Sequence, residues 1–215
     1  FIYGLKMLSN ESTAARGNIV SSIGMLFAVL VTVIEIVNPV LVLSAVLLGA
    51  LIGSAFALKV KMTSIPEMVA LFNGFGGLSS FFLAWSEFNN LSAISLIMIL
   101  SFMTVLIGGI TFSGSVIAFF KLSEILKGDN DFLNKASRWF LIFSFLFVII
   151  AVIQVIAGGL GYEFIDLALI QKIFIALLII SLFAGLAFVL PIGGGDMPVV
   201  ISLLNSFSGI ACLLY

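Results

Sequence analysis

The segments PEMVALFNGFGG (Pro66–Gly77) and PVVISLLNSFSG (Pro198–Gly209) decide the fold of this chain. They lie 132 residues apart, and each carries an asparagine, Asn73 or Asn205, seven residues after its proline. That distance places the asparagine about two helical turns inside a continuously apolar run. Because an amide is costly to bury in lipid, its recurrence predicts a paired polar site inside a membrane protein.

The overall composition excludes a water-soluble globule. Hydrophobic residues make up 62% of the 215 residues and charged residues 9%, whereas soluble domains are roughly 45–50% apolar and about 25% charged. The apolar runs lack the period-two alternation of strands, and only helices or closed barrels satisfy their backbone in lipid. The sequence therefore predicts an all-α fold, a polytopic transmembrane helix bundle.

Apolar windows of about 20 residues, the length that crosses a bilayer, recur along the whole chain. The predicted spans are Gly17–Val37, Val40–Leu58, Ile65–Phe88, Leu91–Phe120, Trp139–Leu160, Leu169–Leu190 and Met197–Tyr215. Pro39, Pro66 and Pro198 mark helix starts, since the first turn does not use the N–H that proline lacks. Because the first residue is Phe1 rather than Met, we interpret the chain as a fragment cut at its N-terminus.

The lysines and arginines predict how the spans are oriented. With these spans, eight of the nine cations fall on one side of the membrane, and only Lys172 falls on the other. Cytoplasmic loops carry the excess of Lys and Arg in membrane proteins. The Lys/Arg-rich loops are therefore predicted to be cytoplasmic.

The residue types present limit the chemistry of the chain. It contains no histidine, and its single cysteine, Cys212, lies in an apolar span. We therefore expect no disulfide and no metal site in this chain, and a histidine base or proton relay must be absent or be supplied by another chain. The run Gly193-Gly194-Gly195-Asp196 follows an apolar helix and has no lysine, so a Gly-rich hinge fits it better than a phosphate loop. Asp196 precedes Pro198 by two residues and is expected to cap the next helix.

An internal repeat extends beyond the two asparagine segments. At the same offset of 132 residues, Gly53–Leu58 (GSAFAL) matches Gly185–Leu190 (GLAFVL). Each second copy lies four spans after the first, an even number, so both run in the same direction, which predicts a parallel repeat of the kind found in transporters. On this logic the span Leu91–Phe120 has a counterpart after Tyr215, and we expect the chain to be truncated there as well.

Three helix faces of small or polar residues follow from the helical spacing of three and four residues. They are Pro66, Ala70, Asn73, Gly77 and Ser80; Pro198, Ser202, Asn205, Gly209 and Cys212; and Thr104, Gly108, Thr111, Ser115 and Ala118. Small faces of this kind commonly pack helix against helix, whereas polar groups on them can also line water. The sequence leaves both interpretations open for the two asparagines.

Three motifs carry a resemblance to a known family. MTSIPEMVALFNGFGG (Met62–Gly77), TFSGSVIAF (Thr111–Phe119) and PIGGGDMPVVISLLNSFSG (Pro191–Gly209) resemble the membrane portion of the beta subunit of proton-translocating NAD(P) transhydrogenase. The resemblance covers nearly the whole chain. It implies that residues 1–215 form a transmembrane proton-channel domain of an enzyme that couples hydride transfer between NAD(H) and NADP(H) to proton movement.

The resemblance also implies cofactors, partners and a location. NADP and NAD would bind soluble domains outside this chain, one being its own C-terminal NADP-binding domain and the other belonging to the alpha subunit. The resemblance therefore implies that the chain carries no catalytic residue. A homodimer of protomers in a bacterial inner membrane, with the lipid bilayer around it and no nucleic acid, is expected.

By resemblance, Asn73 falls where some relatives carry a histidine implicated in the proton path. Asn205 matches a polar position of a later helix, and Asp196 matches an acidic residue of a cytoplasmic loop. The expected proton pathway comprises Asn73, Asn205, Ser115 and Ser202, and the expected coupling loop comprises Gly193, Gly194, Gly195 and Asp196. A free-standing secondary transporter of a small solute, suggested by the repeat, and a purely structural anchor are the alternatives.

Overall fold

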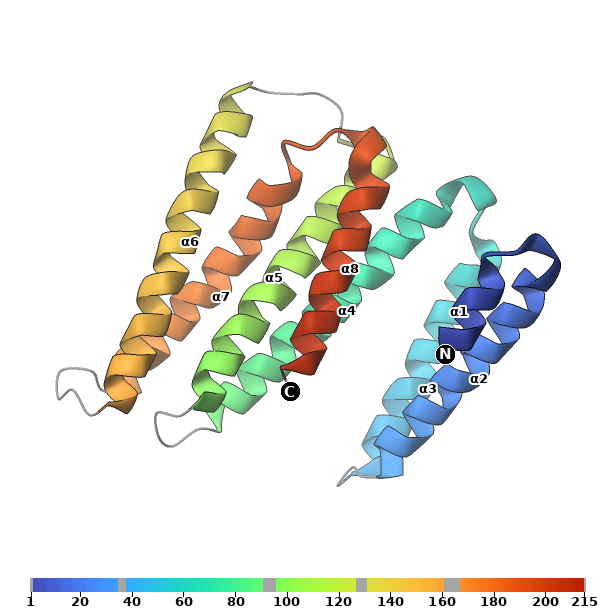
Figure 1. The fold of residues 1–215 in the computed structure, drawn as a ribbon, viewed down its shortest axis with the longest axis horizontal. Coiled ribbons are helices and arrows are strands. Elements are labelled where there is room, and N and C mark those ends of the chain that lie inside the picture. Colours follow the sequence, from blue (N-terminus) through green and yellow to red (C-terminus); the bar gives the residue numbers. More distant parts are fainter. Residues whose placement is uncertain (1, 35–37, 91–95, 127–130, 161–166, 215) are drawn as a thin grey trace. The chain divides into compact units, whose positions relative to one another are not determined.

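The computed structural model describes residues 2–34, 38–90, 96–126, 131–160 and 167–214. Within these ranges the chain is helical and contains no strand (Figure 1). The α-helices are α1 (Ile2–Leu8), α2 (Glu11–Ile34), α3 (Pro39–Lys59), α4 (Ile65–Asn89), α5 (Leu96–Leu122), α6 (Asp131–Gly159), α7 (Leu167–Val189) and α8 (Met197–Leu213). Two short 3-10 helices, η1 (Met62–Ser64) and η2 (Gly194–Asp196), precede α4 and α8. The predicted all-α bundle is confirmed.

Seven of the described helical segments are long and apolar enough to span a membrane. They match the seven predicted spans in number, and they are longer at several ends. The helix α2 begins at Glu11 rather than Gly17, and α6 begins at Asp131 rather than Trp139. Hydropathy marks where a helix meets lipid, whereas the helical backbone continues into the polar region beyond it. The predicted ends at Val37, Leu91 and Tyr215 lie outside the described residues.

The chain divides into two compact units, Phe1–Val60 and Lys61–Tyr215. In the first unit, the short helix α1 packs on α2 through small residues. A Cβ on Gly4 would lie 3.0 Å from the Gly17 carbonyl oxygen, and the Thr13 hydroxyl donates to the Met7 carbonyl at 2.7 Å. These contacts fix the turn between the two helices.

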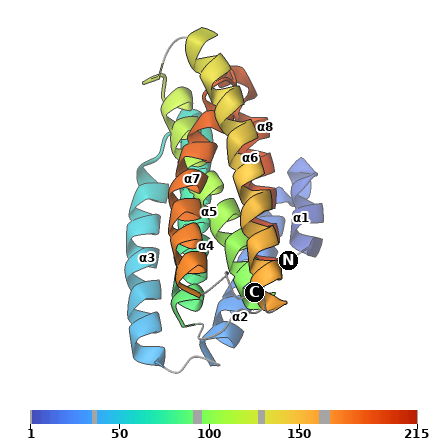
Figure 2. The ribbon, with the colours of Figure 1, turned by 90° about the vertical axis from the view of Figure 1, so that its left-hand side faces the viewer.

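The second unit is organised around α5, which contacts α4, α7 and α8, while α6 packs on the outer side of α7. Figure 1 shows α5 between α4 and α7, and Figure 2 shows the same helices running nearly parallel to one another. The helix α5 therefore packs against three neighbouring helices.

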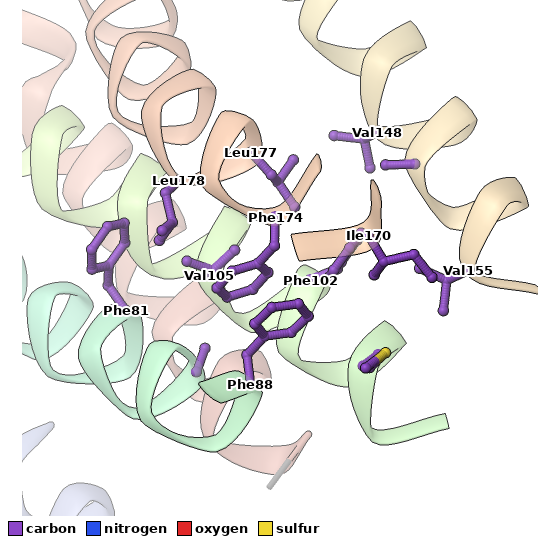
Figure 3. Close-up of a cluster of buried hydrophobic side chains, with 13 residues drawn as sticks. Phe81, Phe88, Phe102, Val105, Val148, Val155, Ile170, Phe174, Leu177 and Leu178 are labelled. Atoms are coloured by element: carbon purple, nitrogen blue, oxygen red, sulfur yellow. The ribbon is translucent and has the colours of Figure 1, made fainter. Parts of the chain in front are cut away.

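An aromatic cluster holds one end of the second unit together (Figure 3). The rings of Phe88 and Phe174 stack with centroids 3.8 Å apart, and Phe102 lies 5.5 Å from Phe174. Val105 and Leu177 pack around them, and all five side chains are buried. Because aromatic pairs add to the dispersion contacts that drive helix association in lipid, this cluster joins α4, α5 and α7.

Glycines allow α5 to approach α4 very closely. A Cβ on Gly77 would lie 2.8 Å from the Phe112 backbone nitrogen, and a Cβ on Gly108 would lie 2.7 Å from the Phe81 backbone nitrogen. On the opposite side of α5, Gly185 of α7 faces the Ile110 carbonyl at similarly close range. Small residues of this kind permit backbone-to-backbone packing between membrane helices.

The starts of α4 and α8 have the same local backbone at the offset of 132 residues. Ser64 and Asp196 have φ/ψ of −97/7° and −92/0°, and each helix then carries its proline in the first turn. Asp196 occupies the predicted N-cap position of α8, but its side chain makes no capping hydrogen bond, because its backbone lies near the helical region instead of the extended region that a capping residue usually adopts. The larger parallel repeat stays a prediction.

Candidate functional site

Asn73 lies on the face of α4 that packs against α5. Its side chain is half-buried, and its Nδ2 donates a hydrogen bond to the Ser115 hydroxyl at 2.9 Å. Gly74 makes this contact possible, because a Cβ on it would lie 3.2 Å from the Ser115 Cβ. The bond leaves the carboxamide oxygen of Asn73 as an acceptor and the hydroxyl hydrogen of Ser115 as a donor.

Asn205 and Ser202 lie on an exposed face of α8 in the second unit. This helix packs on α5 and α4 through the opposite face, where Ile201 and Leu204 join a buried apolar cluster with Ala70. The side chain of Asn205 makes no hydrogen bond within the described residues. The two asparagines therefore have different surroundings although they occupy equivalent places in the repeated segments.

A groove of about 510 Å³ lies between α4 and α8 and brings the predicted residues together. Its lining consists of Val69, Phe72, Asn73, Gly76, Pro198, Ile201, Ser202, Asn205 and Ser208. Three of the four predicted pathway residues line this groove. The fourth, Ser115, lies outside the lining and accepts the hydrogen bond from Asn73. Sequence reasoning missed Ser208, although its position three residues after Asn205 puts it on the same helical face.

The groove-lining side chains can carry hydrogen-bond chemistry. Amides and hydroxyls donate and accept hydrogen bonds, and none of the groove residues is titratable. The arrangement can therefore position water or a polar group between the helices, but it does not itself supply a group that changes protonation near neutral pH.

The predicted coupling loop leads directly into α8. Gly193, Gly194, Gly195 and Asp196 are all exposed, and a Cβ on Gly193 or Gly195 would meet no neighbour within 4 Å. Gly194 approaches the end of α5, since a Cβ on it would lie 3.8 Å from the Lys121 carbonyl oxygen.

Lys121, near the end of α5, binds the end of α7 immediately before this loop. Its Nζ donates to the carbonyl oxygen of Leu190 at 2.5 Å and to those of Val189 and Ile192. A cation at these carbonyls complements the negative end of the helix dipole. In the sequence, Lys121 is one of the eight cations that predict the cytoplasmic side, and its bonding role could not be seen there because the partner carbonyls lie about 70 residues away.

The glycine-rich loop does not fit a dinucleotide. It connects two helices rather than a strand and a helix, it contains no lysine, and its glycines form a 3-10 turn with the exposed carboxylate of Asp196. Among the described residues there is also no group of three or more His, Cys, Asp or Glu side chains that could hold a metal ion.

The fold and the groove define a class of protein, a multi-pass membrane helix bundle with amide and hydroxyl groups along a groove between two of its candidate membrane-spanning helices. A profile of the family described as NAD(P) transhydrogenase beta subunit matches residues 1–214. The chain belongs to the NAD(P) transhydrogenase beta subunit family, which confirms the resemblance drawn from its three motifs.

Two sequences named NAD(P) transhydrogenase subunit beta, both from Rhodospirillum rubrum, are similar to this chain. Each is 31% identical to it over 221 residues. The match covers 97% of this chain and 45% of each relative. The chain therefore spans a little under half the length of these curated relatives.

Proposed function

We propose that this chain is the proton-conducting membrane part of an NAD(P) transhydrogenase, which couples hydride transfer between NAD(H) and NADP(H) to proton movement. The observation that carries the proposal is the groove between α4 and α8, in which Asn73 and Asn205 are brought together inside membrane-spanning helices. Polar residues placed at this depth in a membrane protein mark pathways for ions or protons.

In this proposal the groove holds the water through which protons pass. Asn73 is fixed by Ser115, whereas Asn205 and Ser202 lie on the exposed face of α8 and can exchange partners. Because the groove-lining residues do not titrate, the protonated group is water or a side chain of another subunit. The alpha subunit is the proposed source of such a side chain.

Gly193–Asp196 is the proposed coupling loop. A soluble NADP-binding domain of the same protein would act on this exposed turn, and the loop would transmit the movement to α8. Lys121 holds the end of α7 in place, so the displacement is confined to the glycines and to the helix that begins after them. A tilt of α8 changes the access of water to Asn205.

The remaining features of the proposal concern the assembly. The Lys/Arg-rich loops face the cytoplasm of a bacterial cell, and the chain lies in the inner membrane as part of a homodimer of protomers with alpha subunits. NAD and NADP bind soluble domains outside these residues. Lys172, the one cation that is not on the cytoplasmic side, then lies on the outer side of the membrane.

Asn205→Leu in the full alpha–beta enzyme, reconstituted into sealed vesicles, tests the proposal. Hydride transfer is followed by the absorbance of a nucleotide analogue, and proton uptake is followed by a pH-sensitive dye inside the vesicles. We expect the ratio of protons taken up to hydrides transferred to fall at least about tenfold.

Ser206→Ala is the matched control for this experiment. Ser206 is exposed on α8 and does not line the groove, and its one hydrogen bond among the described residues is to the Ser202 carbonyl within its own helix. Its ratio of protons to hydrides is expected to equal that of the unaltered enzyme. An unchanged ratio in Asn205→Leu would rule out the proposed role of the amide.

A further inference from the structure

Two threonines of α5 have buried hydroxyl groups without a partner. Thr104 and Thr111 are both 0% exposed, and neither hydroxyl has a hydrogen-bond partner in the described part of the chain. Buried serines of the same bundle behave differently. Ser113 and Ser181 each donate to a carbonyl three or four residues earlier in their own helix, at 2.9 and 2.8 Å.

The two threonines extend, along α5, the row of hydrogen-bonding side chains that begins with Asn73 and Ser115. Thr104, Thr111 and Ser115 lie on one face of α5, since they are separated by seven and four residues. The Ser115 hydroxyl accepts the hydrogen bond from Asn73. Thr111 is one helical turn further along, and Thr104 is two turns beyond it, in the direction away from the coupling loop.

This part of the α4–α5 interface is closed by direct contact between the helices. A Cβ on Gly77 would lie 2.8 Å from the Thr111 Cβ and 2.9 Å from the Gly108 carbonyl oxygen. Thr111 therefore lies where α4 and α5 are in close contact. Packing alone does not call for a hydroxyl there, because valine would fill nearly the same volume without an unsatisfied polar group.

We propose that Thr111 and Thr104 are proton-pathway residues whose hydroxyls bind water when α4 and α5 separate. Each hydroxyl then accepts a hydrogen bond from one water and donates to the next, so a proton entering at one end of the chain of waters leaves at the other. The contact between Gly77 and Gly108 keeps this segment closed. A small separation of α4 and α5 opens it to water. The inference rests on the proposed proton-conducting function and extends it to residues outside the groove.

Thr111→Val and Thr104→Val in the full alpha–beta enzyme, in sealed vesicles, test the proposal. We expect the ratio of protons taken up to hydrides transferred to fall at least about tenfold in Thr111→Val, and by less in Thr104→Val. Thr111→Ser keeps the hydroxyl and is expected to keep the ratio of the unaltered enzyme, which a purely structural role of the methyl group would not produce.

Ser113→Ala is the matched control, because it removes a buried hydroxyl of α5 that already bonds to the Gly109 carbonyl. Its ratio is expected to stay unchanged. A ratio in Thr111→Val equal to that of the unaltered enzyme overturns the inference.

A second measurement keeps the inference testable if Thr111→Val folds poorly. Thr111→Cys is combined with Cys212→Ala, and a water-soluble thiol reagent is added at rest and during turnover. We expect labelling of residue 111, identified by peptide mass, to accelerate at least about fivefold during turnover. Equal labelling rates in the two conditions would contradict an opening of this interface.

The results also separate this inference from the function on which it rests. If Asn205→Leu lowers the ratio and Thr111→Val does not, the groove conducts protons by a route that avoids the threonines, and the inference fails alone. If the unaltered enzyme takes up no protons during hydride transfer, the proposed function and the inference fail together.

Discussion

The corresponding faces of α4 and α8 show how one residue pattern can have two structural roles. On α4, Ala70, Gly77 and Ser80 are buried, and Gly77 packs directly against α5. On α8, the residues at the same places in the repeat are Ser202, Gly209 and Cys212, and all three are exposed within the second unit. A stripe of small and polar residues therefore does not define its own role; the helix that faces it does.

The difference extends to the two asparagines. Asn73 is tied to Ser115, and the neighbouring Gly74 is packed against the same helix. Asn205 has no such bond among the described residues, and Gly209, one turn later, has open space around it. One amide is thus held by a neighbouring helix, and the other is exposed within the second unit.

The largest expected effect is on the free energy of unfolding, and it distinguishes Gly77 of α4 from Gly209 of α8. Gly77→Ala places a Cβ 2.8 Å from a backbone nitrogen, whereas Gly209→Ala meets no neighbour within 4 Å. Overpacking typically lowers the free energy of unfolding by about 1–3 kcal/mol, and we expect Gly77→Ala near the upper end of this range because the added Cβ meets backbone atoms. Gly209→Ala is expected to leave it unchanged or to raise it by up to about 1 kcal/mol, because alanine is the better helix former. Equilibrium unfolding in mixed SDS–detergent micelles measures both values, and an equal loss in the two variants would show that another helix covers α8.

A smaller change in the free energy of unfolding is expected where Lys121 of α5 binds the end of α7, just before α8. Lys121→Met removes the donor to the carbonyl of Val189, the last residue of α7, and to those of Leu190 and Ile192 just after it. Hydrogen bonds from charged donors contribute roughly 1.5–3 kcal/mol, so we expect the free energy of unfolding to fall by about 1.5 kcal/mol in the same assay.

Lys172→Met is the control for this prediction, since it makes the same change at an exposed lysine near the other end of α7. It is expected to change the free energy of unfolding by less than about 0.5 kcal/mol. A similar loss in both variants would mean that Lys121 acts only through the net charge of the chain.

Much of this fold could be predicted from the sequence, because in lipid the helix is the only open structure that satisfies the backbone. The seven spans and the proline-marked starts of α3, α4 and α8 follow from that constraint. The starts of α2 at Glu11 and α6 at Asp131 could not be predicted, since both precede the apolar windows. Hydropathy reports the lipid boundary and not the end of a helix.

The sequence predicted which residues form the candidate site better than it predicted what they contact. The repeated spacing singled out Asn73 and Asn205, and both line the groove. The sequence did not predict that the α8 face is exposed, because this depends on which helices pack beside it. The role of Lys121 depends on carbonyls 68 to 71 residues away, and a backbone carbonyl has no signature in the sequence.

A double-mutant cycle on Asn73 and Ser115 measures how firmly the first amide is held. The variants Asn73→Ala, Ser115→Ala and their combination are unfolded in mixed micelles. Hydrogen bonds between membrane helices average about 0.6 kcal/mol and reach about 1.7 kcal/mol, so we expect a coupling energy of about 0.6–1.5 kcal/mol. A coupling energy within error of zero would mean that the 2.9 Å contact does not stabilise the α4–α5 interface.

The corresponding cycle on α8 is expected to give the smallest value of all. Ser202 and Asn205 line the same groove, but the described residues contain no hydrogen bond between their side chains. Distant residues that share no partner are additive within about 0.3–0.5 kcal/mol. Ser202 and Asn205 are neighbours on one helix face, but because their side chains share no hydrogen bond we expect their coupling energy to stay below the same limit. A coupling energy equal to that of Asn73 and Ser115 would show that the second amide is also fixed in the membrane. The two faces would then differ in exposure but not in mobility, and the tilt of α8 would have to leave the environment of Asn205 unchanged.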